Sequence, residues 1–200
     1  MGHLRHTGRC FPGCCAAFWQ DPDSSWHEPD SARPFFCATL KKRKVVSAVF
    51  FRSTHKSDYP AVDALLMQLH RLDLAGRPDL FAPADHYFSR EAFESLLEND
   101  CVLAFLAQER SEILGCCFVS LLDRSGDAPV RTAYVDLLVV DEAHRRQGIG
   151  KAFFREIEKR ARKHGAQKVE LMVWNYNQPA IRAYESYGLT PQRSIYEVRI

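Results

Sequence analysis

One apolar run, Thr132 to Val140, constrains the fold more than any other feature, because Asp136 is its single charged residue. Such a run is typical of a strand that is buried on both faces of a sheet. It is followed by a helical pattern from Gly148 to about Lys163 and then by a second apolar segment, Lys168 to Trp174. Strand–helix–strand units pair their strands in parallel, so an α/β fold is expected.

The remaining periodicities complete a mixed β-sheet flanked by helices. Alternating apolar segments joined by short turns favour hairpins, and spacings of three and four residues favour helices. The further strands are expected at 45–52, 101–108, 113–122 and 192–200, and the further helices at 59–74, 91–97 and 178–187.

Residues 1–44 differ from the rest because no period of 2 or 3.6 persists there and Pro, Ser and Asp are frequent. We interpret them as a poorly ordered tail before a single domain at 45–200. A start of the natural protein near Val45 is an alternative. The His and Cys residues of the tail could bind zinc, but their spacing fits no standard finger. Lys41 to Lys44 could be an import signal or a solvated charge run. The tail could also serve as a protein-interaction module.

Composition excludes several classes of function. The net charge is +2, which argues against a nucleic-acid partner. No apolar run reaches the roughly 18 residues of a membrane helix, and the first residues lack a secretory signal. Seven cysteines without a regular framework indicate reduced thiols and a cytoplasmic protein.

The loop between the buried strand and the helix has the features of an anion site. Gly148 and Gly150 allow a ligand to approach the backbone, and N–H groups at a helix start attract negative charge. Arg145, Arg146 and Lys151 add positive charge. The loop therefore predicts a cradle for phosphate or pyrophosphate, although a glycine loop that merely starts a helix is the simpler alternative.

Two common phosphate motifs do not fit this loop. A Walker A loop needs glycine where Arg145 stands and Ser or Thr where Ala152 stands. A dinucleotide fingerprint needs a third small residue where Phe153 stands.

The segment Arg145-Arg-Gln-Gly-Ile-Gly150 resembles the [Gln/Arg]-x-x-Gly-x-[Gly/Ala] motif of the GCN5-related N-acetyltransferase (GNAT) superfamily. The stretch from Leu171 to Asn177, followed by Ala180, Tyr184 and Gly188, resembles the second signature of that family. The resemblance covers about 45–200. It implies a GNAT fold in which the two central parallel strands, 133–140 and 168–174, splay apart.

The family implies acetyl-CoA as co-substrate and no metal. Backbone groups of the first splayed strand would pair with the pantetheine arm, and an N–H near Leu138 would hold the thioester oxygen as it becomes an oxyanion. The loop and helix start would hold the pyrophosphate, and Asn177, also a helix N-cap candidate, would contact the arm. The implied donor-binding residues are Leu138, Val139, Val140, Arg145, Arg146, Gln147, Gly148, Ile149, Gly150, Lys151 and Asn177.

The implied reaction is direct attack of a primary amine on the thioester. An amine of pKa about 10.4 is less than about 0.1% neutral near pH 7, so a group must accept its proton. Asp136 is the main candidate, as base, water-mediated relay or amine anchor, and strand alternation would place it on the face of Leu138 and Val140. Glu170 and His144 are weaker candidates. A structural acid is the simpler role for Asp136.

Tyr184 matches the family position of the general acid. Tyrosine, of pKa about 10, is a weaker acid than a thiol of pKa about 8.5, so we expect a hydrogen bond to the departing sulfur. A core tyrosine is the simpler role.

The acceptor remains open at this point. The family places it over the first two helices, where Arg77, Asp79, Asp85, His86 and Tyr87 could line a site. A non-catalytic acyl-CoA-binding regulator is the alternative function. Exchange of the last strand between subunits would give a homodimer.

Overall fold

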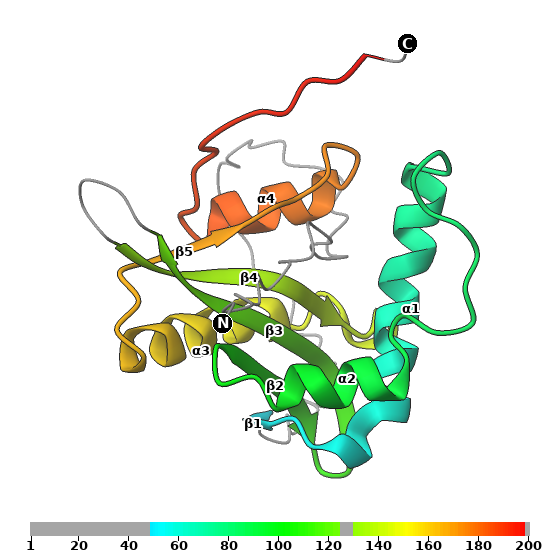
Figure 1. Cartoon of the computed structure of the whole chain (residues 1–200), viewed down its shortest axis with the longest axis vertical. Coiled ribbons are helices and arrows are strands. Elements are labelled where there is room, and N and C mark those ends of the chain that lie inside the picture. The colour runs from blue at the N-terminus through cyan, green and yellow to red at the C-terminus, as the bar shows by residue number, and fades with distance from the viewer. Residues whose placement is uncertain (1–48, 125–129, 199–200) are drawn as a thin grey trace, which may run out of the picture.

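The computed structural model describes residues 49–124 and 130–198. The described strands and helices follow the expected order along the chain as far as α4 (Figure 1). The elements are β1 (Phe50–Ser53), α1 (Tyr59–Gly76), α2 (Arg90–Leu97), β2 (Val102–Glu109), β3 (Glu112–Arg124), β4 (Val130–Val140), α3 (Ile149–Lys163), β5 (Lys168–Leu171) and α4 (Gln178–Ser186), with short 3-10 turns at Lys56–Asp58 and Glu142–His144.

The five strands form one mixed sheet in the order β1-β2-β3-β4-β5. Neighbouring strands from β1 to β4 are antiparallel, whereas β4 and β5, joined through α3, are parallel. The mixed α/β fold expected from the sequence is therefore confirmed.

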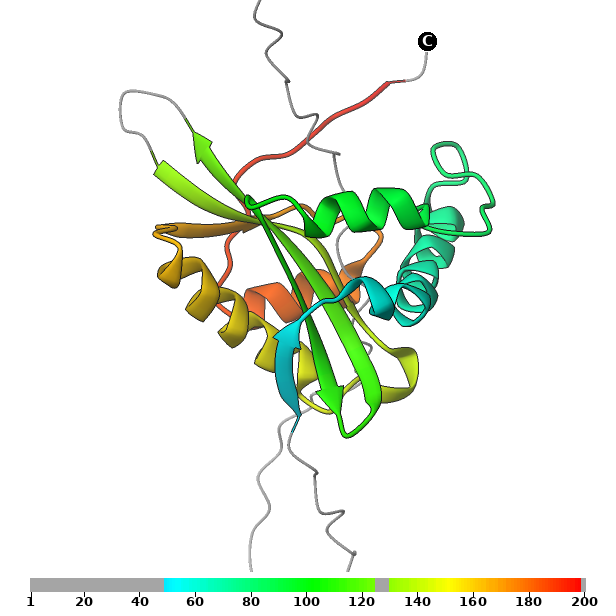
Figure 2. The ribbon, with the colours of Figure 1, turned by 60° about the horizontal axis from the view of Figure 1, so that its bottom comes forward.

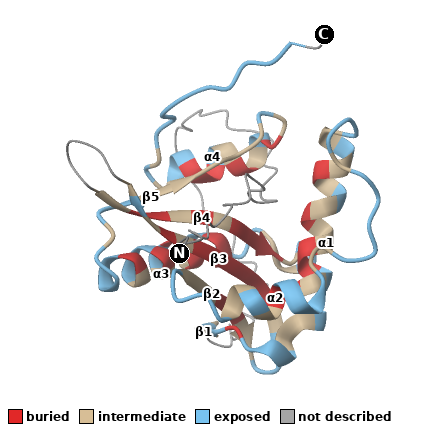
Figure 3. Ribbon diagram, viewed as in Figure 1, coloured by how far each residue is buried: buried red, intermediate tan, exposed pale blue. Residues whose placement is uncertain are grey.

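Helices cover both faces of the sheet (Figure 2). On one face, α1 and α2 bury Leu66, Leu69 and Phe93 against β2, β3 and β4. On the other face, α3 and α4 pack Phe153 and Tyr184 against the same sheet. The central strands are buried along most of their length, as the apolar run predicted (Figure 3).

Two expected strands differ in the structure. The segment expected to extend as a strand to Trp174 ends as β5 at Leu171. The strand expected at 192–200 is wrong over its described part, because residues 192–198 form no strand and are exposed. Tyr196 and Val198, on either side of Glu197, have the alternation of a strand. A strand also requires a hydrogen-bonding neighbour, which the described residues do not provide.

The N-terminal tail and the interpretations placed on it lie outside the described residues. Within the part of the chain that is described, no helix combines the length and apolar character needed to cross a membrane.

Candidate active site

A β-bulge in β4 places Asp136 at the centre of the candidate site. Phe118 of β3 pairs with Leu137, and the next residue, Val119, pairs with Val135, so Asp136 is an extra residue in β4. Bulges bend a strand and redirect its side chains, and they occur often beside active sites.

The pairing of β4 with β5 ends at the same point. The parallel ladder runs from Thr132 and Lys168 to Val135 and Leu171, and the chain that follows β5 turns away from β4 (Figure 1). Beyond Val135, no described strand pairs with this edge of β4. The two central parallel strands therefore separate, as the resemblance implied.

The backbone of β4 presents polar groups to this gap. The N–H of Asp141 donates to the Leu114 carbonyl of β3 at 2.9 Å. Backbone groups of successive strand residues point to opposite edges, so Val139 also faces β3, whereas Leu138 and Val140 face the gap. The N–H of Leu138 is thus directed into the gap.

Asp136 is partly buried and accepts a hydrogen bond from the Ser120 hydroxyl at 2.6 Å. Burial raises the pKa of this carboxyl, and the bond from Ser120 offsets part of the rise. A carboxyl with a raised pKa accepts a proton more readily than an exposed one does.

The expectation that Asp136 shares a face with Leu138 and Val140 is wrong. Leu138 and Val140 pack in the cluster under α3, whereas Asp136 bonds Ser120, whose neighbours Val119 and Leu121 point to α3. Ser120 and Asp136 therefore lie on the opposite face, the one that α1 and α2 cover in part. The bulge breaks the alternation on which the expectation depended.

The two weaker base candidates are engaged elsewhere. Glu170 pairs with Lys168 and Arg124, both at 2.6 Å, and these cations lower its pKa. His144 contacts Asp141 at 2.7 Å in the turn after β4. The lowered pKa of Glu170 contrasts with the burial-raised pKa of Asp136.

The loop before α3 has the geometry of an anion cradle. Arg146 and Gly148 both have positive φ, 62° and 82°, and Gly148 caps α3 without a side-chain hydrogen bond. The first N–H groups of a helix have no partner within it, and alternating backbone conformations turn such groups toward one point. Ile149 and Gly150 are buried at this helix start, and Lys151 is exposed beside it. This geometry fits an anion such as a pyrophosphate.

Arg145 connects the loop to β4. Its Nε donates to the Val140 carbonyl at 3.2 Å, and burial lowers its pKa. Its guanidinium therefore fastens the loop to the end of β4, whereas Arg146 and the exposed Gln147 remain at the surface of the cradle.

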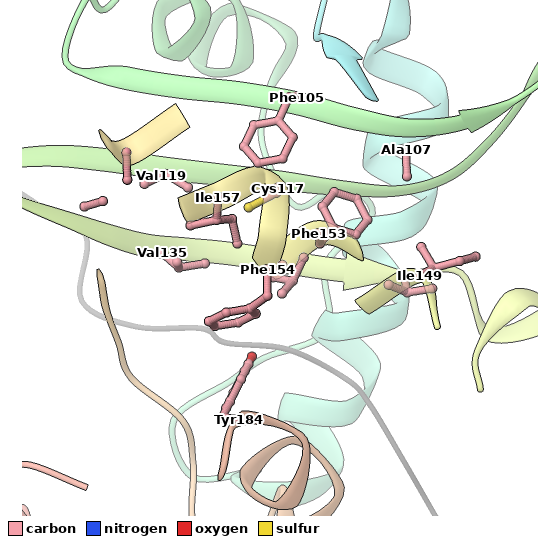
Figure 4. Packing of buried hydrophobic residues seen from close by; sticks show 14 of the residues in the cluster. Phe105, Ala107, Cys117, Val119, Val135, Ile149, Phe153, Phe154, Ile157 and Tyr184 are labelled. Carbon is pink, nitrogen blue, oxygen red and sulfur yellow. The ribbon is translucent and has the colours of Figure 1, made fainter. Parts of the chain in front are cut away.

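Tyr184 and Asn177 come from the chain after β5. Tyr184 is buried on α4, packs against Phe154 with ring centroids 5.7 Å apart, and points its hydroxyl toward β4 (Figure 4). Asn177 accepts from the Ala180 N–H at 3.2 Å, so its N-cap role is present. Tyr184 and Asp136 thus approach β4 from opposite faces of the sheet.

Sequence reasoning missed a contact between α1 and the loop after β5. The Tyr176 hydroxyl donates to the buried carboxylate of Asp73 at 2.7 Å. A Cβ on Gly76 would lie 2.5 Å from the Tyr176 ring, so only glycine permits this approach. Trp174 stacks on Tyr176 and lies under Arg77. No local pattern could have joined residues about 100 positions apart.

The acceptor residues suggested by the sequence do not form one group. Arg77 pairs with Asp79 and Glu197 at the C-terminal end of α1. His86 and the Tyr87 N–H instead bind Asp63, near the other end of α1. Residues 63 and 77 are about 21 Å apart along a helix, at 1.5 Å per residue. Asp85 is exposed.

Among the residues that the structure describes, no three His, Cys, Asp or Glu side chains lie together as metal ligands would.

A sheet opened between parallel strands, beside a helix start that can hold an anion, is the arrangement expected of acyltransferases that take their acyl group from coenzyme A. The chain belongs to the acetyltransferase (GNAT) family, whose model matches residues 66–189.

Solved structures with this fold cover 76% of the chain. A tetramutant of the BH1408 protein from Bacillus halodurans is 25% identical, with a TM-score of 0.73 over 99% of its length. A ribosomal-protein-alanine N-acetyltransferase from Brucella melitensis is 23% identical, with a TM-score of 0.59 over 99% of its length. An aminoglycoside acetyltransferase from a soil metagenomic sample is 21% identical, with a TM-score of 0.56 over 99% of its length. No curated protein matches the chain.

Proposed function

We propose that this protein is an N-acetyltransferase that transfers the acetyl group of acetyl-CoA to a primary amine by direct attack on the thioester. The observation that carries the proposal is the gap beside β4. The Leu138 N–H of β4 faces this gap, the Asp136 carboxyl lies on one face of the strand, and the Tyr184 hydroxyl of α4 points toward it from the other.

The donor would span the gap and the cradle. Its pantetheine arm would lie along Leu138, Val139 and Val140, in the place that a paired β5 would otherwise occupy, with Asn177 beside it. Its pyrophosphate would bind the N–H groups from Gln147 to Lys151.

The positions of Asp136 and Tyr184 suit the order of bond changes. The amine nitrogen attacks the thioester carbon from the α1/α2 face, and Asp136 accepts its proton directly or through water. The carbonyl oxygen gains negative charge and is stabilised by the Leu138 N–H. The C–S bond then breaks, and Tyr184 donates a hydrogen bond to the departing thiolate from the α3/α4 face.

Isothermal titration of acetyl-CoA into the full chain, beside a Gly150→Trp variant whose side chain blocks the cradle, tests donor binding. We expect micromolar binding that is lost in the folded variant. Thiol release in the presence of amines of several classes then tests transfer. Binding without turnover for any amine would favour the alternative, an acyl-CoA-binding regulator.

Three further points belong to this proposal. Residues 45–200 form the catalytic domain, and 1–44 are a separate tail. The seven cysteines, which show no regular framework in the sequence, support a reducing cytoplasmic location. The exposed apolar side chains of Ile195, Tyr196 and Val198, together with the edge strand β5, support a homodimer in which each copy pairs its C-terminal segment with the other.

A further inference from the structure

A glutamine on α1 holds the turn from which the anion cradle begins. The Gln68 side-chain amide donates to Asp141 Oδ1 at 2.8 Å, and its carbonyl oxygen accepts from the Glu142 N–H at 3.0 Å. The two bonds join α1 to consecutive residues at the end of β4, more than 70 positions away in the sequence.

The cradle needs such support because its backbone is strained. Arg146 has φ 62°, a left-handed conformation that costs a non-glycine residue about 1–2 kcal/mol. A strained residue persists only where the surrounding structure fixes it. Between Val140 and α3 the loop contains only one short 3-10 turn, Glu142–His144, so its shape depends on contacts with other elements.

Contacts from other parts of the fold fix the same turn. The Asp141 N–H donates to the Leu114 carbonyl at 2.9 Å, and the other Asp141 carboxylate oxygen contacts His144 at 2.7 Å. The Arg145 Nε donates to Val140. Gln68 adds the connection to α1, the helix that the Asp73–Tyr176 bond also joins to the chain after β5.

We infer that Gln68 is a positioning residue of the donor site. By holding Asp141 and Glu142, it sets the direction in which the loop enters the strained cradle. That direction in turn determines whether the backbone N–H groups of the cradle converge on the pyrophosphate. It touches neither the thioester nor the amine, so its loss should weaken donor binding more than it slows the chemical step. This inference rests on the proposed function, in which the cradle binds acetyl-CoA.

The test is Gln68→Met, which keeps the length of the side chain and removes both hydrogen bonds. We expect the Kd and KM for acetyl-CoA to rise about 5- to 20-fold, with kcat changed less than about twofold. Gln108→Met is the matched control, because the Gln108 amide also accepts one bond, from Arg52, and donates one, to the Arg110 carbonyl, but lies on β2. We expect its Kd to stay within twofold of the wild-type value.

A second variant distinguishes loss of the hydrogen bonds from a packing defect caused by methionine. Gln68→Glu keeps the acceptor for the Glu142 N–H and places a carboxylate against Asp141, so it should lose donor affinity to a similar extent at pH 8. A double-mutant cycle of Gln68→Met with Asp141→Ala should show a combined loss well below the product of the single losses.

The outcomes separate the two proposals. If the wild-type protein does not bind acetyl-CoA, the proposed function fails. If it binds, and the folded Gln68 variants bind equally well or lose kcat instead of affinity, the inference about Gln68 is overturned.

Discussion

In the proposed function, Asp136 combines a catalytic position with a cost in stability. Its pKa is raised in the folded protein, so the folded state binds the proton more tightly than the unfolded chain does. At neutral pH the ionised carboxylate therefore lowers the free energy of unfolding, and this cost disappears as the pH falls below the ordinary aspartate range, about 4.

Asp136→Asn should consequently give a more stable and less active protein. The amide carbonyl can still accept from Ser120, but it cannot take a proton from the amine. We expect turnover to fall about 100-fold or more, while the melting temperature at pH 7 rises above that of the wild-type protein. Thermal melts from pH 7 to pH 3.5 should show the difference in melting temperature closing. Unchanged turnover would assign Asp136 a structural role.

Tyr184 can be tested against a neighbouring tyrosine. Tyr184→Phe retains the ring that packs on Phe154 and removes only the hydroxyl, so we expect kcat to fall about tenfold or more with the Kd for acetyl-CoA unchanged. Tyr187 also packs on Phe154, with centroids 5.0 Å apart, and has no proposed role in the reaction. Tyr187→Phe should keep wild-type kcat, and equal kcat in all three proteins would reject the role of Tyr184.

At the level of single residues, the sequence could identify Asp136 but not its orientation. Its identity as the one charge in an apolar run is a local property. The face that it occupies depends on a bulge defined by the register with β3, which no local pattern encodes. Ser120 and Gln68 could not be found for the same reason, since their roles consist of contacts between distant segments.

At the level of elements, the start of α3 is the part of the site most open to a backbone test. Gly148 has φ 82°, and a Cβ built there would meet no atom within 4 Å. Gly188, after α4, has φ 90° and is equally open. Alanine at either position therefore costs only backbone strain, about 1–2 kcal/mol of stability.

The two alanine variants should differ in function. Gly148→Ala should weaken acetyl-CoA binding by about tenfold as the cradle relaxes, whereas Gly188→Ala should lose similar stability and keep the wild-type Kd. Chemical denaturation and titration of both proteins measure the two quantities. Equal Kd values for the two variants would contradict the cradle assignment.

The sequence predicts elements with strong periodicity well, but it predicts the residues at which they end less well. The pattern of α3 and the apolar run of β4 are local, and both elements are confirmed. The sequence Met172 to Trp174 continues the apolar pattern of β5, yet the strand ends at Leu171 because β4 bends at its bulge and no longer offers a partner.

At the level of the whole molecule, two strand edges have no described partner: the edge of β4 that faces the gap, and the outer edge of β5. The gap beside β4 has a chemical purpose in the proposed function. The outer edge of β5 has no described neighbour, and Ile195 and Val198 are 78% and 85% exposed on an extended segment. Exposed edges and exposed apolar strands tend to associate, and identical copies can satisfy each other by reciprocal exchange.

Sedimentation velocity over a range of protein concentrations tests this assembly. We expect a dimer for the wild-type chain and a monomer for the Ile195→Asp, Val198→Asp double variant, because charges cannot be buried against the partner sheet. The control is the Gln192→Asp, Ser194→Asp double variant, which adds the same charge at polar positions of the same segment. This protein should remain dimeric. A wild-type monomer at all concentrations would contradict the exchange. Retention of acetyl-CoA binding by the monomeric variant would place the donor site within one copy, as the contacts of β4 and α3 require.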